Sequence, residues 1–130
     1  MKGTKPTLVV DNAAAVRKVP PAPTWLSAAA KAEWRRVAPL MVERRILTDA
    51  DLGSLENYCL AQGRVRDIQK MLAGVEPEAW LKLTRAQDKA ITMARQLAAE
   101  LGLTPVSRSR PGIREPEGDD DDEPNPLNVS

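Results

Sequence analysis

Most of the eleven prolines in this 130-residue chain lie near its two ends. Because proline lacks a backbone N–H and clashes with the preceding turn of a helix, it does not belong inside regular structure. Regular structure is therefore expected in the middle of the chain. There, apolar residues recur at helical spacing, and no segment alternates apolar and polar residues as a strand does. The sequence predicts an all-α fold.

The length of the chain allows one domain, and only 3% of its residues are aromatic, so the core must be small. Association between copies is a common way for so short a chain to bury more surface. We expect a flexible basic arm over residues 1–23, a helical domain over 24–110 and an acidic, disordered tail over 111–130. The helical domain should contain an N-terminal helix and two long helices.

The first helix should follow Ser27, a favourable N-cap residue that precedes a run of alanines. Ordered structure is expected from Trp25 onward, with Trp25 and Trp34 anchoring the helix on the core. On a helical wheel, the side centred on Trp34 also holds Ala30, Val37, Ala38 and Met41. The opposite side holds Arg35, Arg36 and Glu43. Pro39 cannot continue an unbroken helix, so we expect a kink or a break near residue 38.

The second helix should open at Thr48, where Asp51 completes a capping-box pattern, and run to about Ala73 before Gly74. Its apolar residues form two patches, rotated by roughly 120° from each other on the helical wheel. The first patch is Leu52, Leu55, Tyr58 and Cys59, and the second is Ala61, Val65, Ile68 and Leu72. We expect this helix to pack on two partners, of which one could be another subunit. The candidate oligomer interface is Leu52, Leu55, Val65, Ile68 and Leu72.

Residues 74–83, which include Trp80, are expected to form a loop. The third helix should begin at Thr84, because Gln87 completes a second capping-box pattern there. It should end at Gly102 and present one broad apolar face rich in alanine, which allows a neighbouring helix to approach closely.

The near-neutral total charge of the chain hides two parts of opposite sign. Residues 1–114 hold all 19 Lys and Arg with 11 Asp and Glu, whereas residues 115–130 hold 7 acids and no cation. A basic body of this kind favours an anionic partner. The acidic tail would compete for that site or bind something else.

Several function classes are disfavoured by residues that the chain lacks. It has no histidine, which rules out the usual Ser-His, Cys-His and two-His metal arrangements, and no phosphate-binding glycine motif. Cys59 lies in an apolar patch and reads as a core thiol. The run GDDDDE reads as a solvated segment rather than a metal site. We therefore expect no enzyme activity, no cofactor and no bound metal. A single cysteine, no membrane span and no secretory signal favour the cytosol.

Clusters of cations are the candidate binding residues. Arg108, Arg110 and Arg114 follow the third helix with no acid between them, and arginines can bind phosphate through paired hydrogen bonds. Double-stranded DNA fits better than single strands, because the few aromatic residues are placed as core anchors. For any one pair, a solvated surface position is the alternative. The candidate DNA-binding residues are Lys5, Arg17, Lys18, Lys31, Arg35, Arg36, Arg108, Arg110 and Arg114.

Three stretches in this order and spacing resemble the small subunit of tailed-bacteriophage terminase: PAPTWLSAAAKAEWRRVAPLM, ILTDADLGSLENYCLAQGRVRDIQKML and RQLAAELGLTPVSRSR. The basic opening MKGTKP is also similar to that of the family. The resemblance implies a ring-shaped homo-oligomer in the cytoplasm of the host cell. It also implies that the chain binds viral double-stranded DNA at the packaging start site and recruits and regulates the large terminase subunit, which holds the ATPase and nuclease.

Two other functions stay open from the residues alone. One is a small helical transcription regulator that binds DNA as a dimer. The other is an assembly adaptor without affinity for DNA, whose cations serve an acidic protein partner. The mass in solution separates a ring from a dimer, and retention on DNA at low salt separates either from the adaptor.

Overall fold

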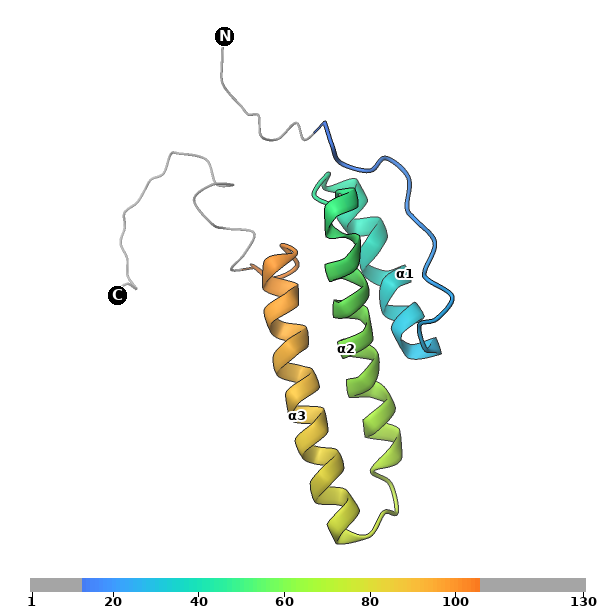
Figure 1. Ribbon diagram of the computed structural model, residues 1–130, viewed down its shortest axis with the longest axis vertical. Helices are drawn as coiled ribbons and strands as arrows, with labels where there is room; N and C mark the ends of the chain where they lie inside the picture. Colours follow the sequence, from blue (N-terminus) through green and yellow to red (C-terminus); the bar gives the residue numbers. More distant parts are fainter. Residues whose placement is uncertain (1–12, 106–130) are drawn as a thin grey trace, which may run out of the picture.

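A computed structural model of the chain describes residues 13–105, and within them the fold is three α-helices with no strand. Helix α1 spans Ala28–Glu43, a short 3-10 helix η2 spans Asp49–Asp51, α2 spans Leu52–Met71 and α3 spans Pro77–Glu100. Helices α2 and α3 form a long antiparallel hairpin, and α1 packs on the side of α2 that faces away from α3 (Figure 1). The all-α prediction is confirmed.

Helix α2 lies between the other two helices, and this arrangement explains its two apolar patches. Both α1 and α3 contact α2. Leu55, Tyr58 and Cys59 of the first patch and Ala61 of the second are buried in the core. Packing on two partners is thus satisfied inside one subunit. Helix α1 covers only part of the hairpin, so the end with the α2–α3 connection extends beyond it (Figure 1).

Helix α1 begins as the sequence predicts, with the Ser27 hydroxyl accepting a hydrogen bond from the backbone N–H of Ala30 at 3.2 Å. Its expected apolar face is buried along its whole length, at Ala30, Trp34, Val37, Ala38 and Met41. Of the kink or break expected near residue 38, the break is wrong, because the helix continues through Pro39 to Glu43. Proline removes one backbone donor and crowds the preceding turn, but the buried residues on both sides of Pro39 hold the helix against α2.

The two tryptophans at the start of the domain differ in role. Trp34 is 2% exposed, and its indole N–H donates a hydrogen bond to the carbonyl of Pro20 at 2.8 Å. Trp25 is 57% exposed, so the expectation that it anchors the helix is wrong. Leu26, one residue later, occupies the buried position instead.

Contacts with the core begin before residue 25. The backbone N–H of Val16 donates to the carbonyl of Leu47 at 2.8 Å, and Ala15 forms an isolated bridge with Thr48. Val16 and Ala22 pack against the core. The segment 13–23 of the expected arm therefore runs along α1 (Figure 1). The remainder of the arm, residues 1–12, and the acidic tail lie outside the described residues.

The capping box predicted before α2 is confirmed, whereas the start predicted for α3 is wrong. The predicted capping box is present: the Asp51 carboxylate accepts hydrogen bonds from the backbone N–H and the hydroxyl of Thr48. The predicted loop over 74–83 is wrong, because α3 begins at Pro77. Proline fits the first turn of a helix, where its missing N–H has no partner to lose. Thr84 therefore lies inside α3, and Gln87 donates to the carbonyl of Val65 on α2 at 3.1 Å instead of capping a helix.

Candidate nucleic-acid interface

The predicted DNA-binding residues that the structure describes are Arg17, Lys18, Lys31, Arg35 and Arg36. All of them are exposed except Lys31, which is half-buried. Lys5, Arg108, Arg110 and Arg114 lie outside the described residues. The described cations come from the segment before α1 and from α1 itself, and they fall into separate places rather than one cluster.

Lys31 and Arg35 line the same groove between α1 and the segment that precedes it. This groove has a volume of about 410 Å³, and Pro20, Pro21 and the Trp34 side chain form part of its wall. The two cations are four residues apart, a spacing that places them next to each other on one side of the helix. The hydrogen bond from Trp34 to Pro20 fixes the opposite wall. Two cations on an open groove are suited to an extended anionic ligand.

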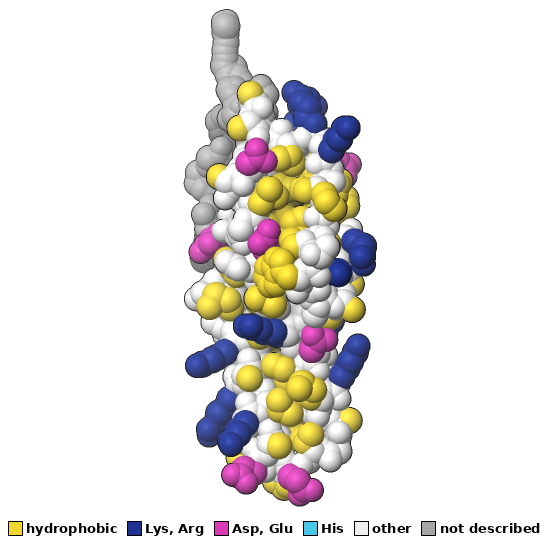
Figure 2. Space-filling view, turned by 45° about the vertical axis from the view of Figure 1, so that its right-hand side comes forward, with side chains coloured by type: hydrophobic (Ala, Val, Ile, Leu, Met, Phe, Trp, Pro, Cys, Tyr) yellow, Lys and Arg dark blue, Asp and Glu magenta, His cyan; other side chains and the backbone are white. Residues whose placement is uncertain are grey.

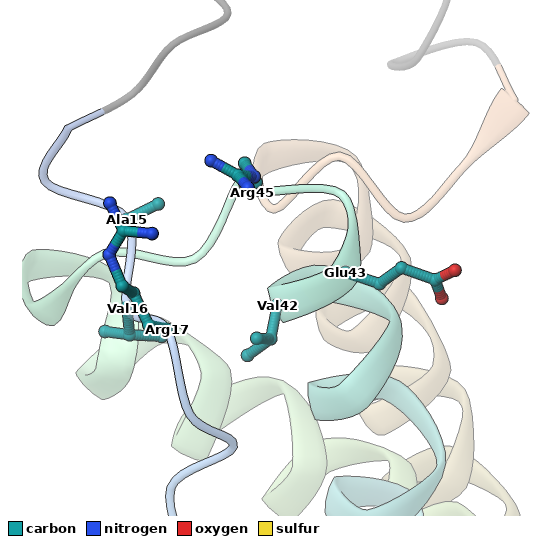
Figure 3. A pocket seen from close by; sticks show the side chains of 6 residues that line it. All are labelled: Ala15, Val16, Arg17, Val42, Glu43 and Arg45. Atoms are coloured by element: carbon teal, nitrogen blue, oxygen red, sulfur yellow. The ribbon is translucent and has the colours of Figure 1, made fainter.

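A second hollow, of about 260 Å³, lies where the N-terminal segment passes the end of α1, and Arg17 lines it together with Arg45 (Figure 3). The Glu43 carboxylate points away from Arg45 (Figure 3). Arg45 has a φ of 59°, in the left-handed region where glycine is usual. Its N–H donates to Val42 and that of Ile46 donates to Met41, which closes the helix with a Schellman motif. Arg45 was not among the candidate binding residues.

Arg36 lies on the other side of α1, next to a buried carboxylate. Glu33 is 3% exposed and is the one charged residue buried among the described residues. Its carboxylate accepts hydrogen bonds from Arg36 Nε at 3.1 Å and Nη2 at 2.6 Å, and from the Tyr58 hydroxyl at 2.5 Å. Arg66 Nη2 of α2 lies 3.9 Å from Glu33 Oε1. This ion pair joins Arg66 to α1.

The pKa values of this group follow from burial and pairing. Burial acts to raise the pKa of Glu33, but the hydrogen bonds from Arg36 and Tyr58 and the charges of Arg36 and Arg66 hold it below its ordinary value. Burial and the bond to Glu33 raise the pKa of Tyr58. The Glu33 carboxylate raises the pKa of Arg36. Glu33 is therefore ionised and Tyr58 is neutral at neutral pH.

The candidate interface residues on α2 are not equivalent. Leu55 is fully buried, so it has no surface left to offer a second subunit. Leu52 is half-buried and packs against the core. Val65 and Ile68 of α2 and Leu72, which directly follows this helix, are half-buried.

Ile68 lines a third groove, of about 620 Å³, between α2 and α3. Its apolar lining consists of Ala61, Ile68, Met71, Ala86, Ala90 and Met93, and Arg64, Asp67 and Lys89 complete it. Met71 and Met93 are more than half exposed. Trp80 and Leu81 are also exposed, near the end of the hairpin that extends beyond α1. Figure 2 shows apolar side chains on the surface of this part, flanked by Lys and Arg.

The remaining chemistry of the described residues is sparse. Cys59 is fully buried, and burial raises the pKa of its thiol to about 12, as expected for a core thiol. No three His, Cys, Asp or Glu side chains in residues 13–105 lie together in a way that could hold a metal ion. Within the same range, no helix is both long and apolar enough to cross a membrane.

Comparison with protein families gives a match to the phage terminase small subunit over residues 30–118. The match covers more than half of the chain, from Ala30 in α1 through the whole of α3. The chain belongs to the phage terminase small subunit family. The resemblance seen in the sequence is thereby confirmed, and the protein has a role in phage DNA packaging. No curated protein and no solved structure matches the chain.

Membership in a DNA-packaging family directs attention to the cations of this terminase small subunit. Sequence reasoning found Arg36 but missed Glu33, Arg66 and Arg45. Glu33 gave a usable signal, because a wheel centred on Trp34 places it 100° away, next to Val37 on the buried side. Arg66 gave no such signal, since its nearness to α1 depends on how two helices cross.

Proposed function

We propose that this chain binds double-stranded viral DNA at the packaging start site, forms a ring with copies of itself, and recruits and regulates the large terminase subunit. The observation that carries the proposal is the family match over α1, α2 and α3. The work is expected to take place in the cytoplasm of the host cell, where viral DNA and the large subunit meet.

The described cations support contact with a nucleic-acid backbone. Lys31 and Arg35 share one groove, and Arg17 shares a hollow with Arg45. Contacts to phosphate give affinity and strong salt dependence but carry no base information. Each subunit would supply only a few such contacts. A ring would add them by avidity, because the second and later contacts become intramolecular.

The surface of the hairpin supports self-association. Met71 and Met93 are exposed at the groove between α2 and α3, and α1 leaves this end of the hairpin uncovered (Figure 1). Contiguous exposed apolar side chains mark interaction sites in soluble proteins. A second copy of the chain is the occupant that ring formation requires. The interface predicted from sequence would then involve Ile68 through this groove, and not Leu55.

Retention of the protein on viral duplex DNA over a salt series tests DNA binding. The proposal expects retention at about 50 mM salt and a loss of affinity of several orders of magnitude toward 200 mM, as phosphate contacts require. The variant Lys31→Gln/Arg35→Gln should bind more weakly at every salt concentration. No retention at about 50 mM would favour the adaptor without DNA affinity and contradict the proposal.

A further inference from the structure

The Glu33 carboxylate is buried between α1 and α2, where charged and polar side chains surround it. Moving an ionised carboxylate out of water costs several kcal/mol unless charged partners compensate. Here the compensating groups are Tyr58 from α2 and Arg36 from α1, with Arg66 of α2 close by. An apolar residue at position 33 would fill the same core without that cost. The arrangement therefore calls for a reason beyond packing.

The effect of Glu33 on its surroundings is to bring two guanidinium groups together at the surface. The Arg36 and Arg66 side chains are 61% and 55% exposed, although both approach a carboxylate that is 2% exposed. Without Glu33 between them, two like charges from different helices would repel each other. With Glu33 present, the two guanidinium groups lie close together where α1 and α2 pack on each other. The three charged groups together carry one net positive charge.

Most hydrogen-bond donors of the two guanidinium groups remain available. A guanidinium carries five N–H donors, and Arg36 uses two of its donors on Glu33. Arg66 Nη2 lies at 3.9 Å, beyond hydrogen-bonding distance. The Glu33 oxygens already accept three bonds, and both arginine side chains are more than half exposed. A fixed fork of this kind matches the oxygens of a phosphate group.

We propose that Glu33 holds Arg36 and Arg66 together as one binding site for a backbone phosphate of double-stranded DNA. Arg36 and Arg66 contact the phosphate, whereas Glu33 and Tyr58 are positioning residues. This inference rests on the proposed DNA-binding function, and it adds Arg66, on α2, to a set of described contacts that otherwise comes from α1 and the segments directly before and after it.

The direction in which Glu33→Gln changes the affinity for DNA distinguishes positioning of Arg36 from simple attraction by net charge. Glu33→Gln gives the chain one more net positive charge, so attraction by net charge predicts tighter DNA binding. The positioning account predicts weaker binding, because glutamine keeps one acceptor oxygen but lacks the charged pair of oxygens that orients Arg36. It also predicts that adding Glu33→Gln to Arg36→Gln causes little further loss, since residues that act through one contact are not additive.

The experiment measures the affinity of the full chain for viral duplex DNA between about 50 and 200 mM salt. Arg36→Gln and Arg66→Gln should each weaken binding roughly tenfold at about 100 mM and lower the salt slope by about 1 per bound subunit. Arg95→Gln removes the same charge from an exposed position on α3, and it should change affinity by less than about threefold. Arg66 is more than half exposed and makes no hydrogen bond to Glu33, so Arg66→Gln should keep the fold even if Glu33→Gln or Arg36→Gln, which disturb the buried ion pair, do not.

Three outcomes would overturn the inference. Arg36→Gln and Arg66→Gln could behave like Arg95→Gln while the wild type binds DNA, which would leave the proposed function standing. They could keep DNA binding but lose the large subunit, which would assign the pair to a protein carboxylate. Finally, the wild type could show no binding at about 50 mM, in which case the DNA-binding function fails as well.

Discussion

Gly63 of α2 crosses Ala30 of α1 so closely that a Cβ on Gly63 would lie 2.8 Å from the Ala30 backbone nitrogen. The atoms in the way belong to the Ala30 backbone and its Cβ, and they cannot move aside as the end of a flexible side chain can. This contact sets the distance between α1 and α2. It also places Glu33, one turn further along α1, within reach of Tyr58 and Arg66.

Gly63→Ala should therefore destabilise the protein by about 1–3 kcal/mol, because overpacking forces the two helices apart. Gly53→Ala is the matched control, since it lies on the same helix with nothing within 4 Å of the added Cβ. That change should stabilise the protein by about 0.5–1 kcal/mol, as alanine does in an exposed helical position. Urea unfolding of both variants measures the difference. Equal effects of the same sign would show that the crossing is not tight.

Stability should fall in acid through Glu33. The carboxylate has a lower pKa in the folded chain than its ordinary value of 4.5, so its contribution is fully present above pH 4.5. It is lost as the pH falls below that value toward the pKa of the folded state. Unfolding measured between pH 3 and pH 7 should show a shallower acid decline in Glu33→Gln than in the wild type. An unchanged decline would mean that other carboxylates govern it.

Tyr58→Phe should destabilise the chain by about 1.5–3 kcal/mol, because it removes a hydrogen bond to a charged and buried group. It should also make the acid decline shallower, since Glu33 loses a donor that lowers its pKa and the pKa values of the folded and unfolded states come closer together. The helical circular-dichroism signal at neutral pH serves as the check that the fold is kept. A stability within about 0.5 kcal/mol of the wild type would argue against this bond.

Arg45→Gly should stabilise the chain by about 1 kcal/mol, because glycine adopts the left-handed conformation at no steric cost. The neighbouring residue Arg44 has a φ of −84°, an ordinary helical value. Arg44→Gly removes the same charge and should give no such gain. If Arg45 also contacts DNA from the hollow that it shares with Arg17, the stabilised variant should bind DNA more weakly. Thermal unfolding measures the change in stability, and retention on DNA measures the change in binding.

The parts of the fold that local sequence determines were predictable. The Trp34 face of α1, the Ser27 cap and the capping box of Thr48 and Asp51 each depend on residues within one or two turns of each other. The start of α3 was missed because the capping-box pattern at Thr84 was given more weight than the simpler fit of Pro77 to a first turn. Pro39 was misjudged because burial on both sides of it, a tertiary effect, outweighs one lost hydrogen bond.

The candidate site was less predictable than the fold. Arg35 and Arg36 are adjacent in sequence and appear as one cluster, but successive residues on a helix point about 100° apart. The structure accordingly places Arg35 at the groove beside Pro20 and Arg36 beside Glu33. The network of Glu33 and Tyr58 joins residues on two different helices. Nothing in a single sequence states that pairing.

Met93→Glu should weaken self-association, because it places a charge in the apolar groove between α2 and α3. Thr92→Glu adds the same charge at the preceding residue, which is exposed and does not line the groove. We expect the mass of Met93→Glu in solution to fall toward that of the monomer and the mass of Thr92→Glu to stay as in the wild type. Equal masses for both variants would place the interface elsewhere.

The most direct test of the account is the mass of the purified full chain in solution, measured by light scattering. A ring that binds viral DNA through many weak phosphate contacts requires an assembly well above a tetramer, and the account predicts that mass for the wild type. A monomer or a dimer, with DNA and the large subunit absent or present, would contradict the ring and favour a small DNA-binding regulator.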